Sequence, residues 1–116
     1  MNTRITLRFD FDETRRLGPG KVSLLEAIQR HGSIAAAGRD FGMSYRRAWL
    51  LVDELNHMFQ APLVQAHGGG RNGGGAVLTE LGGTVVALYR KAEHKMSRSA
   101  AQEIETIERA LAHKAV

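Results

Sequence analysis

The fold is decided by the stretch Gly42-Met43-Ser44-Tyr45-Arg46-Arg47-Ala48-Trp49. Gly42 can adopt the left-handed backbone that a tight turn needs, and Ser44 is of a residue type that caps helices. After Ser44, apolar residues recur at alternating steps of three and four, the spacing of a helix with one buried side. The predicted buried positions are Tyr45, Ala48, Val52, Leu55 and Phe59, with Trp49 at their edge. The stretch therefore predicts a turn followed by an amphipathic helix from Ser44 to Gln60.

Two shorter helices are predicted before this turn. The first covers Val22 to Arg30, where apolar residues recur at helical spacing, and Gly32 stands where a left-handed residue commonly ends a helix. Ser33 then suits the cap of the second helix. This second helix is expected to bury Phe41 on its inner side and to end at Gly42.

The segment from Thr3 to Phe11 alternates between apolar and polar residues. Alternation with a period of two is typical of a strand that has one buried face. The sequence therefore predicts a strand at the start of the chain. The side chains expected on its buried face are Ile5, Leu7, Phe9 and Phe11.

A second pair of strands is predicted after the third helix. Pro62 ends that helix, and the residues from Leu63 to Ala66 have a strand pattern. The segment from His67 to Gly75 is dense in glycine, and the apolar residues from Ala76 to Leu78 suit a returning strand. Two strands joined by a glycine-rich tip predict a wing, a hairpin that reaches beyond the helices.

A long final helix is predicted to begin at Thr79, which is well placed to cap it. If this helix continued unbroken to Leu111 it would measure roughly 50 Å at ~1.5 Å per residue, more than a small domain needs. Whether the helix breaks near Ser97 to Ser99 is left open by the sequence. One apolar stripe is a candidate dimerisation surface: Leu81, Val85, Leu88, Ala92, Ile104, Ile107 and Leu111.

The order of these elements is strand, three helices, strand, glycine loop, strand and long helix, which is the order of a winged helix-turn-helix. The predicted fold class is mainly α with a small β wing and a long C-terminal dimerisation helix. We expect a single domain with two regions. Residues 1–78 form the DNA-binding region, and residues 79–116 form the dimerisation helix region.

The composition of the 116-residue chain fits one globular domain, because 43% of its residues are apolar and 24% are charged. No apolar run approaches the ~20 residues needed to cross a bilayer, so we expect a soluble, cytoplasmic protein without a membrane partner. The chain has no cysteine, which excludes disulfides and thiolate chemistry. Its net charge of +4 permits a polyanionic partner.

The position of the positive charges favours such a partner. Arg46 and Arg47 fall in the first turn of the third helix, where cations oppose the helix dipole at a cost of about 0.3 to 1 kcal/mol. Phosphates would offset that cost, and the arginine fork also reads guanine. Arg71 lies among glycines that permit close approach to DNA. A solvated face and a hairpin tip without a role remain the alternatives. The candidate DNA-binding residues are Ser44, Tyr45, Arg46, Arg47, Leu50, Arg71 and Asn72.

Four stretches together resemble the N-terminal DNA-binding domain of the ModE molybdate-responsive regulators, which is similar in layout to the LysR-type helix-turn-helix. They are the run from Gly42 to Trp49, Asp53-Glu54-Leu55-Asn56, the run from Gly73 to Thr79, and Leu81-Gly82.

The resemblance implies that Ser44, Tyr45, Arg46 and Arg47 contact DNA. It also implies that Arg71 and Asn72 belong to the wing, and that the stripe from Leu81 onward pairs two protomers. Regulators that sense molybdate carry a second, oxyanion-binding domain, whereas this chain stops at Val116. We therefore expect a stand-alone DNA-binding module in which a molybdate or other oxyanion effector is unsupported.

Other chemistries fit the sequence less well. Gly68, Gly70 and Gly73 satisfy G-x-G-x-x-G, but a strand pattern follows them instead of the helix that a dinucleotide site requires. No two of the five histidines have helical metal-ligand spacing. We therefore expect a protein that is not an enzyme and that binds no cofactor and no metal. We expect a homodimeric, sequence-specific transcriptional regulator that binds double-stranded DNA, with repression as one candidate action. A protein-interaction module and a nucleoid protein without sequence preference remain alternatives.

Overall fold

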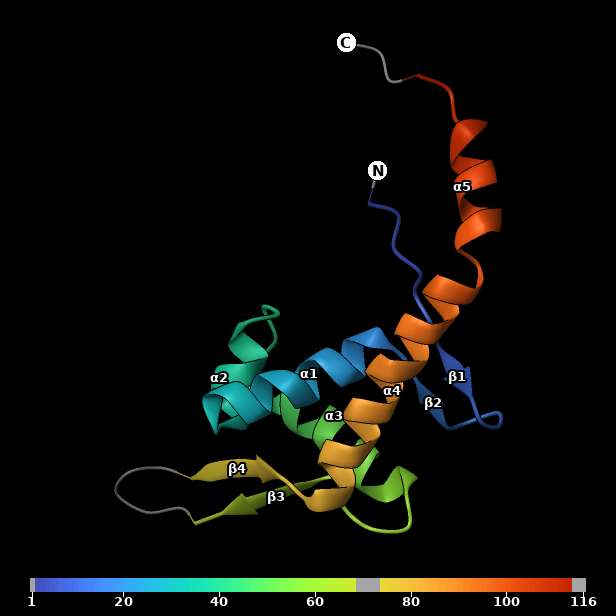
Figure 1. The fold of residues 1–116 in the computed structure, drawn as a ribbon. Coiled ribbons are helices and arrows are strands. Elements are labelled where there is room, and N and C mark those ends of the chain that lie inside the picture. The colour runs from blue at the N-terminus through green and yellow to red at the C-terminus, as the bar shows by residue number, and fades with distance from the viewer. Residues whose placement is uncertain (1, 69–73, 114–116) are drawn as a thin grey trace.

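The computed structural model describes residues 2–68 and 74–113. Figure 1 shows α1, α2 and α3 gathered into one body, the β3–β4 hairpin lying beside them, and α4 leading away from this body to α5. This arrangement confirms a mainly helical winged helix-turn-helix with small antiparallel strand pairs. The elements are β1 (Phe9–Asp10), β2 (Arg16–Leu17), α1 (Pro19–His31), α2 (Ile34–Arg39), α3 (Tyr45–Met58), β3 (Val64–His67), β4 (Gly75–Leu78), α4 (Glu80–Ser99) and α5 (Ala101–Arg109).

The predicted helix caps are confirmed. Gly32 ends α1 in the left-handed conformation with φ of 66°. The hydroxyl of Ser33 accepts a hydrogen bond from the amide of Ala36 at 3.1 Å, and the hydroxyl of Ser44 accepts one from the amide of Arg47 at 3.1 Å. Each serine satisfies an amide that the first turn of its helix leaves unpaired.

The end of α2 differs from the prediction. The helix ends at Arg39 instead of Gly42, because the carbonyl of Gly38 accepts from the amides of both Phe41 and Met43 at 3.0 Å and turns the chain early. Gly42 still has a positive φ of 66°. Phe41 therefore lies in the turn, 43% exposed, and not on a buried helix face.

The helices of the helix-turn-helix pack closely around small residues. A Cβ atom on Gly38 would lie 2.9 Å from the Cβ of Ala48 on α3, so glycine permits this crossing. Leu24, Leu25 and Leu55 are fully buried beneath the crossing. The buried side of α3 thus belongs to the core and leaves its opposite side outside.

The N-terminal strand is much shorter than expected. Only β1 pairs, with Phe9 opposite Leu17 of β2. Leu7 and Phe9 pack against the core as predicted, but Phe11 is 52% exposed. Residues before Phe9 have no neighbouring strand within the described residues. They follow α4 instead, where the hydroxyl of Tyr89 donates to the carbonyl of Leu7 at 2.7 Å.

The wing hairpin is confirmed and is fastened at its base. In β3 and β4, Val64 pairs with Leu78 and His67 with Gly75. The amide of Ala76 donates to the carbonyl of Gly32 at 2.9 Å, which joins β4 to the end of α1. The wing therefore has a fixed position relative to the helices.

The C-terminal helix is broken, at Ala100, directly after the segment in which the sequence left a break open. Ala100 separates α4 from α5 with φ of −100° and ψ of 9°. Because α5 ends at Arg109, Leu111 lies beyond the helix. None of the helices among residues 2–68 and 74–113 combines the length and apolar character needed to cross a membrane.

Candidate nucleic-acid interface

The first turn of α3 carries the candidate contact residues on its outer side. Its cap, Ser44, fixes where this turn begins. Tyr45 is 58% exposed and Leu50 is 50% exposed, and Arg46 and Arg47 are also exposed. The structure thus exposes all five candidate residues on one helix, but on two sides of it. Ser44, Arg46, Arg47 and Leu50 line one surface hollow, and Tyr45 lines another, beside the wing.

Tyr45 departs from the prediction that it heads the buried stripe. Ala48, Val52 and Leu55 are buried as expected, whereas Tyr45 lines an open groove beside Ile34 of α2. Its phenol is therefore available as a hydrogen-bond donor to a ligand.

The two arginines of this turn have no ion-pair partner among the described residues. The first turn of α3 contains no acidic residue. Arg46 and Arg47 therefore oppose the helix dipole without compensation inside the described part of the protomer. Such uncompensated guanidinium groups are suited to phosphate or to guanine edges.

The acidic residues of α3, unlike Arg46 and Arg47, each have a neighbouring side chain of opposite type. Glu54 accepts from the ammonium group of Lys21 on α1 at 2.9 Å. Asp53 lies 3.4 Å from His57, one turn further along α3. Carboxylates that could repel a polyanion are thus placed beside basic groups, while the arginines at the start of the helix face outward. The exposed start of α3 therefore has a positive character that the net charge alone does not locate.

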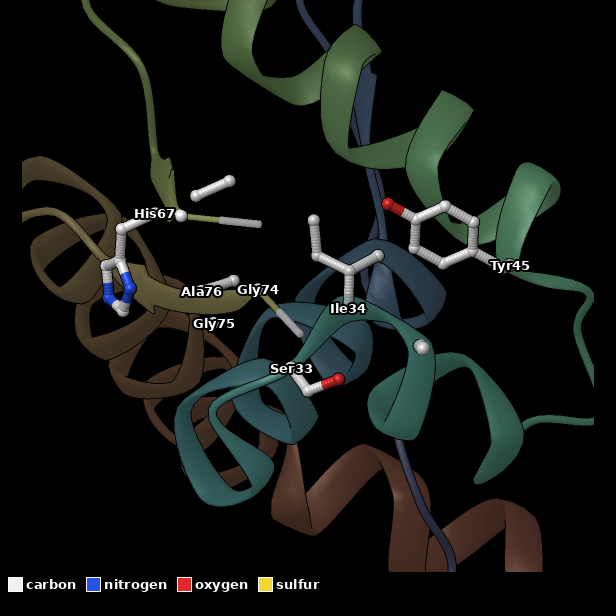
Figure 2. Close-up of a pocket in the computed structure, with 10 residues that line it drawn as sticks. Ser33, Ile34, Tyr45, His67, Gly74, Gly75 and Ala76 are labelled. Carbon is white, nitrogen blue, oxygen red and sulfur yellow. The ribbon is translucent and has the colours of Figure 1, made fainter. Parts of the chain in front are cut away.

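A groove of about 650 Å³ separates this helix start from the wing. Figure 2 shows Tyr45 extending from α3 toward Ile34, with Ser33 at the start of α2 and Gly74, Gly75 and Ala76 on the wing side. Two hydroxyl groups and glycine backbone share the lining with the side chains of Ile34, Ala35, Ala66, His67 and Ala76. The hydroxyl and backbone groups are of the kinds that contact a sugar-phosphate strand. Sequence reasoning missed this groove, because it forms only where three distant segments meet.

Arg71 and Asn72 lie in residues 69–73, outside the described residues. Their predicted place in the wing therefore stays a prediction. The described part of the wing consists of β3 and β4 (Figure 1).

The proposed dimerisation stripe is only partly exposed. The most buried residues of α4 are Gly82, Val86 and Tyr89, one position beyond the predicted stripe. Leu81 and Val85 are half-buried at the edge of this core. Ala92 and Ile104 are also half-buried. Residues that remain largely exposed are Leu88 at 59%, Ile107 at 66% and Leu111 at 57%.

Two polar residues have structural roles that the sequence does not predict. Asn56 bonds to the base of β3, and Arg90 joins α4 to α1. Nothing in their local sequence pattern signals these contacts, because each partner lies far along the chain or across a turn. Within the described residues, no group of three His, Asp or Glu side chains could hold a metal ion.

Comparison with known proteins adds a family match. The model described as bacterial regulatory helix-turn-helix protein, lysR family, matches residues 20–83. These residues run from α1 through the helix-turn-helix and wing to the first turn of α4. The match covers more than half of the chain and includes every described candidate DNA-contact residue.

Several proteins whose names refer to molybdenum or to transcriptional regulation are similar to this chain. A molybdenum-pterin-binding protein, MopA of Rhodobacter capsulatus, is 45% identical over 84 residues, which are 72% of this chain and 32% of that protein. The molybdenum transport protein ModE of Azotobacter vinelandii is 41% identical over 87 residues, 75% of this chain and 32% of that protein. The DNA-binding transcriptional dual regulator ModE of Escherichia coli K12 is 37% identical over 89 residues, 77% of this chain and 34% of that protein. The chain thus spans about a third of the length of these relatives.

Proposed function

The chain belongs to the bacterial regulatory helix-turn-helix proteins of the lysR family, and from that membership we propose that it is a homodimeric, sequence-specific DNA-binding regulator of transcription. Residues 1–78 bind DNA, and residues 79–116 pair two protomers. It acts in the cytoplasm on double-stranded DNA and has no catalytic role.

The observation that carries the proposal is the exposed, uncompensated arginine pair at the start of α3. In a helix-turn-helix, the second helix enters the major groove with its N-terminal residues leading. Arg46 and Arg47 occupy that leading turn, and Leu50 follows one turn later on the accessible side. Guanidinium groups there reach guanine edges or phosphates, while Leu50 offers an apolar contact to a thymine methyl group.

The groove beside the wing supports a second contact, with the DNA backbone. Phosphate contacts fix how a protein sits on the duplex, and base contacts provide the specificity. Tyr45 and Ser33 border this groove, so a strand lying there would place α3 in the adjacent major groove. Arg71 and Asn72, whose positions are not described, are proposed to extend this backbone contact from the wing.

Dimerisation is supported by exposed apolar residues of α4, of α5 and of the segment directly after α5. Leu88, Ile107 and Leu111 each keep more than half of their surface exposed, and pairing two copies would remove that surface from water. A two-fold dimer presents two α3 helices to half-sites about 34 Å apart, or a multiple of that distance.

The genes under control are proposed to be connected with molybdenum. The names of the similar proteins refer to molybdenum transport or to a molybdenum-pterin. An effector is not part of the proposal, because this chain spans only about a third of the length of these proteins.

The test is selection of bound duplexes from a random pool, followed by fluorescence anisotropy with the selected duplex and a scrambled duplex. We expect the selected duplex to bind about 10³-fold or more tightly than the scrambled one. The slope of log affinity against log salt should be about −0.9 for each phosphate contacted. Equal affinity for both duplexes would indicate a nucleoid protein instead, and no binding to either would favour a protein-interaction module.

A further inference from the structure

Arg90 makes the main polar connection between α4 and α1. Its Nη2 atom donates to Glu26 Oε1 at 2.7 Å and its Nε atom to Glu26 Oε2 at 3.1 Å. The same Nη2 atom lies 3.2 Å from the hydroxyl of Ser23, and Nη1 donates to Glu93 at 2.7 Å. One guanidinium group thus contacts three side chains, two on α1 and one on α4 itself.

The geometry of this group makes the connection directional. Arginine and a carboxylate joined by two parallel hydrogen bonds hold each other in one relative orientation. The side chains of Arg90 and Glu26 are 35% and 29% exposed, and that of Glu93 is 19% exposed, so water competes for these bonds only in part. The hydrogen bonds to Glu26 raise the pKa of Arg90 above its ordinary value.

A second attachment lies at the start of α4. The amide of Thr79 donates to the carbonyl of Leu63 at 2.9 Å, and its hydroxyl donates to the carbonyl of Pro62 at 2.7 Å. A Cβ atom on Gly82 would collide with the carbonyl oxygen of Leu63, so the first turn of α4 rests directly on backbone. This turn is the first point at which α4 is attached to the body. Arg90 provides the second point, about 12 Å further along the helix from Gly82.

These two attachments set the direction in which α4 leaves the body. A small movement of α4 at Arg90 therefore becomes a larger displacement further along the chain. The end of α5 lies about 40 Å along the chain from Gly82 if both helices are treated as one rod. A movement of 1 Å at Arg90 would therefore become roughly 3 Å at that end. Tyr89 also contacts the body, through its ring on Phe9 and its hydroxyl on the carbonyl of Leu7. These two contacts join α4 to the N-terminal segment, whereas Arg90 joins it to α1.

We propose that Arg90 is a positioning residue that clamps α4 to α1, and so sets the separation of the two DNA-reading helices in the dimer. The inference rests on the proposed function, in which α4 and α5 pair the protomers and α3 reads DNA. The clamp and the proposed dimer stripe lie on different sides of α4, because Arg90 and Glu93 face α1 while Leu88 is exposed. One side of α4 would therefore contact the partner protomer, and the other side would fix the body that contains α3.

The first test measures a distance within one chain and requires no DNA. Because the chain has no cysteine, His57→Cys on α3 and Arg98→Cys on α4 provide two labelling sites for spin-label distance measurement. His57 is 77% exposed, and Arg98 is exposed. Labelled protein is diluted with unlabelled protein so that only distances within one chain contribute.

We expect a narrow distance distribution in the protein with Arg90 and a broader one after Arg90→Lys or Glu26→Gln. Lysine keeps the charge but loses the fork, and glutamine keeps the size but loses the charge. Arg15→Lys is the matched control, because it alters an exposed arginine–aspartate pair in the β1–β2 turn. An unchanged distribution in both clamp variants would overturn the proposal, even if their melting temperatures fell, since an ordinary ion pair affects stability alone.

The second test uses duplexes in which the two selected half-sites are separated by different numbers of base pairs. Wild-type protein should bind one half-site spacing more tightly than the others. We expect this ratio of affinities to fall several-fold in the clamp variants, while their affinity for a single half-site stays unchanged. The same spacing preference in wild type and both variants would contradict the clamp. If the wild-type protein bound no duplex, the proposed function would fail, and the distance measurement would still decide the role of Arg90.

Discussion

Asn56 bonds three backbone groups at the base of the wing. Its side-chain oxygen accepts from the amides of Leu63 and Val64, both at 2.9 Å. Its side-chain nitrogen donates to the carbonyl of Val64 at 3.0 Å. Leu63 and Val64 are buried, so no solvent readily replaces these bonds. One amide side chain thereby joins α3 to the base of the wing.

Asn56→Ala is expected to lower the free energy of unfolding by about 2 to 4 kcal/mol, because two buried amides lose their acceptor. Chemical denaturation followed by circular dichroism measures this loss. His57→Ala is the matched control, since the neighbouring ring is 77% exposed. Comparable losses in the two variants would show that the bonds of Asn56 contribute little.

Residue type and spacing predict correctly that Arg46 and Arg47 are exposed, but they do not predict the burial of every nearby residue correctly. Arg46 and Arg47 were expected outside, because charge and helical position agree there. Tyr45 and Phe41 were expected to be buried and are exposed. Aromatic residues fit either environment, and periodicity does not show where covering elements end. The sequence does not predict the roles of Asn56 and Arg90, because these roles depend on partners that only the folded chain brings near.

The first turn of α4 provides the sharpest prediction at the scale of an element. Gly82→Ala is expected to destabilise the protein by about 1 to 3 kcal/mol, because the new methyl group would press on the Leu63 carbonyl. The adjacent variant Gly83→Ala has open space around its Cβ and should stabilise the helix by about 1 kcal/mol. Thermal unfolding of both variants distinguishes them, and shifts of equal sign would refute the close contact.

Elements with local signals were predicted well, and elements with non-local determinants were not. Serine caps and a left-handed glycine place the helix ends around Ser33, Ser44 and Gly32 through bonds within a few residues. The strand at the N-terminus required a partner, and β2 supplies pairing only to Phe9 and Asp10. The alternation before Phe9 instead reflects packing of Leu7 beside α4.

At the scale of the whole molecule, α4 and α5 carry exposed apolar side chains away from the body (Figure 1). Sedimentation equilibrium at micromolar concentration should give twice the 12.7 kDa of one chain. Leu88→Asp should give the single-chain mass, because a carboxylate would be buried at the interface. Ala87→Asp is the control, since it places the same charge about 100° around the exposed helix. A wild-type protein that sediments as one chain would remove the dimer from the account.

The most direct test of DNA recognition by α3 is the affinity of the Arg46→Ala and Arg47→Ala variants for the selected duplex, measured by fluorescence anisotropy. Each variant is expected to lose about 1 to 3 kcal/mol of binding free energy and to accept a wider set of sequences if its arginine reads bases. Arg98→Ala, which removes the same charge from an exposed position on α4, should bind almost as tightly as wild type. Wild-type affinity in both α3 variants, or an equal loss in Arg98→Ala, would contradict recognition through the first turn of α3.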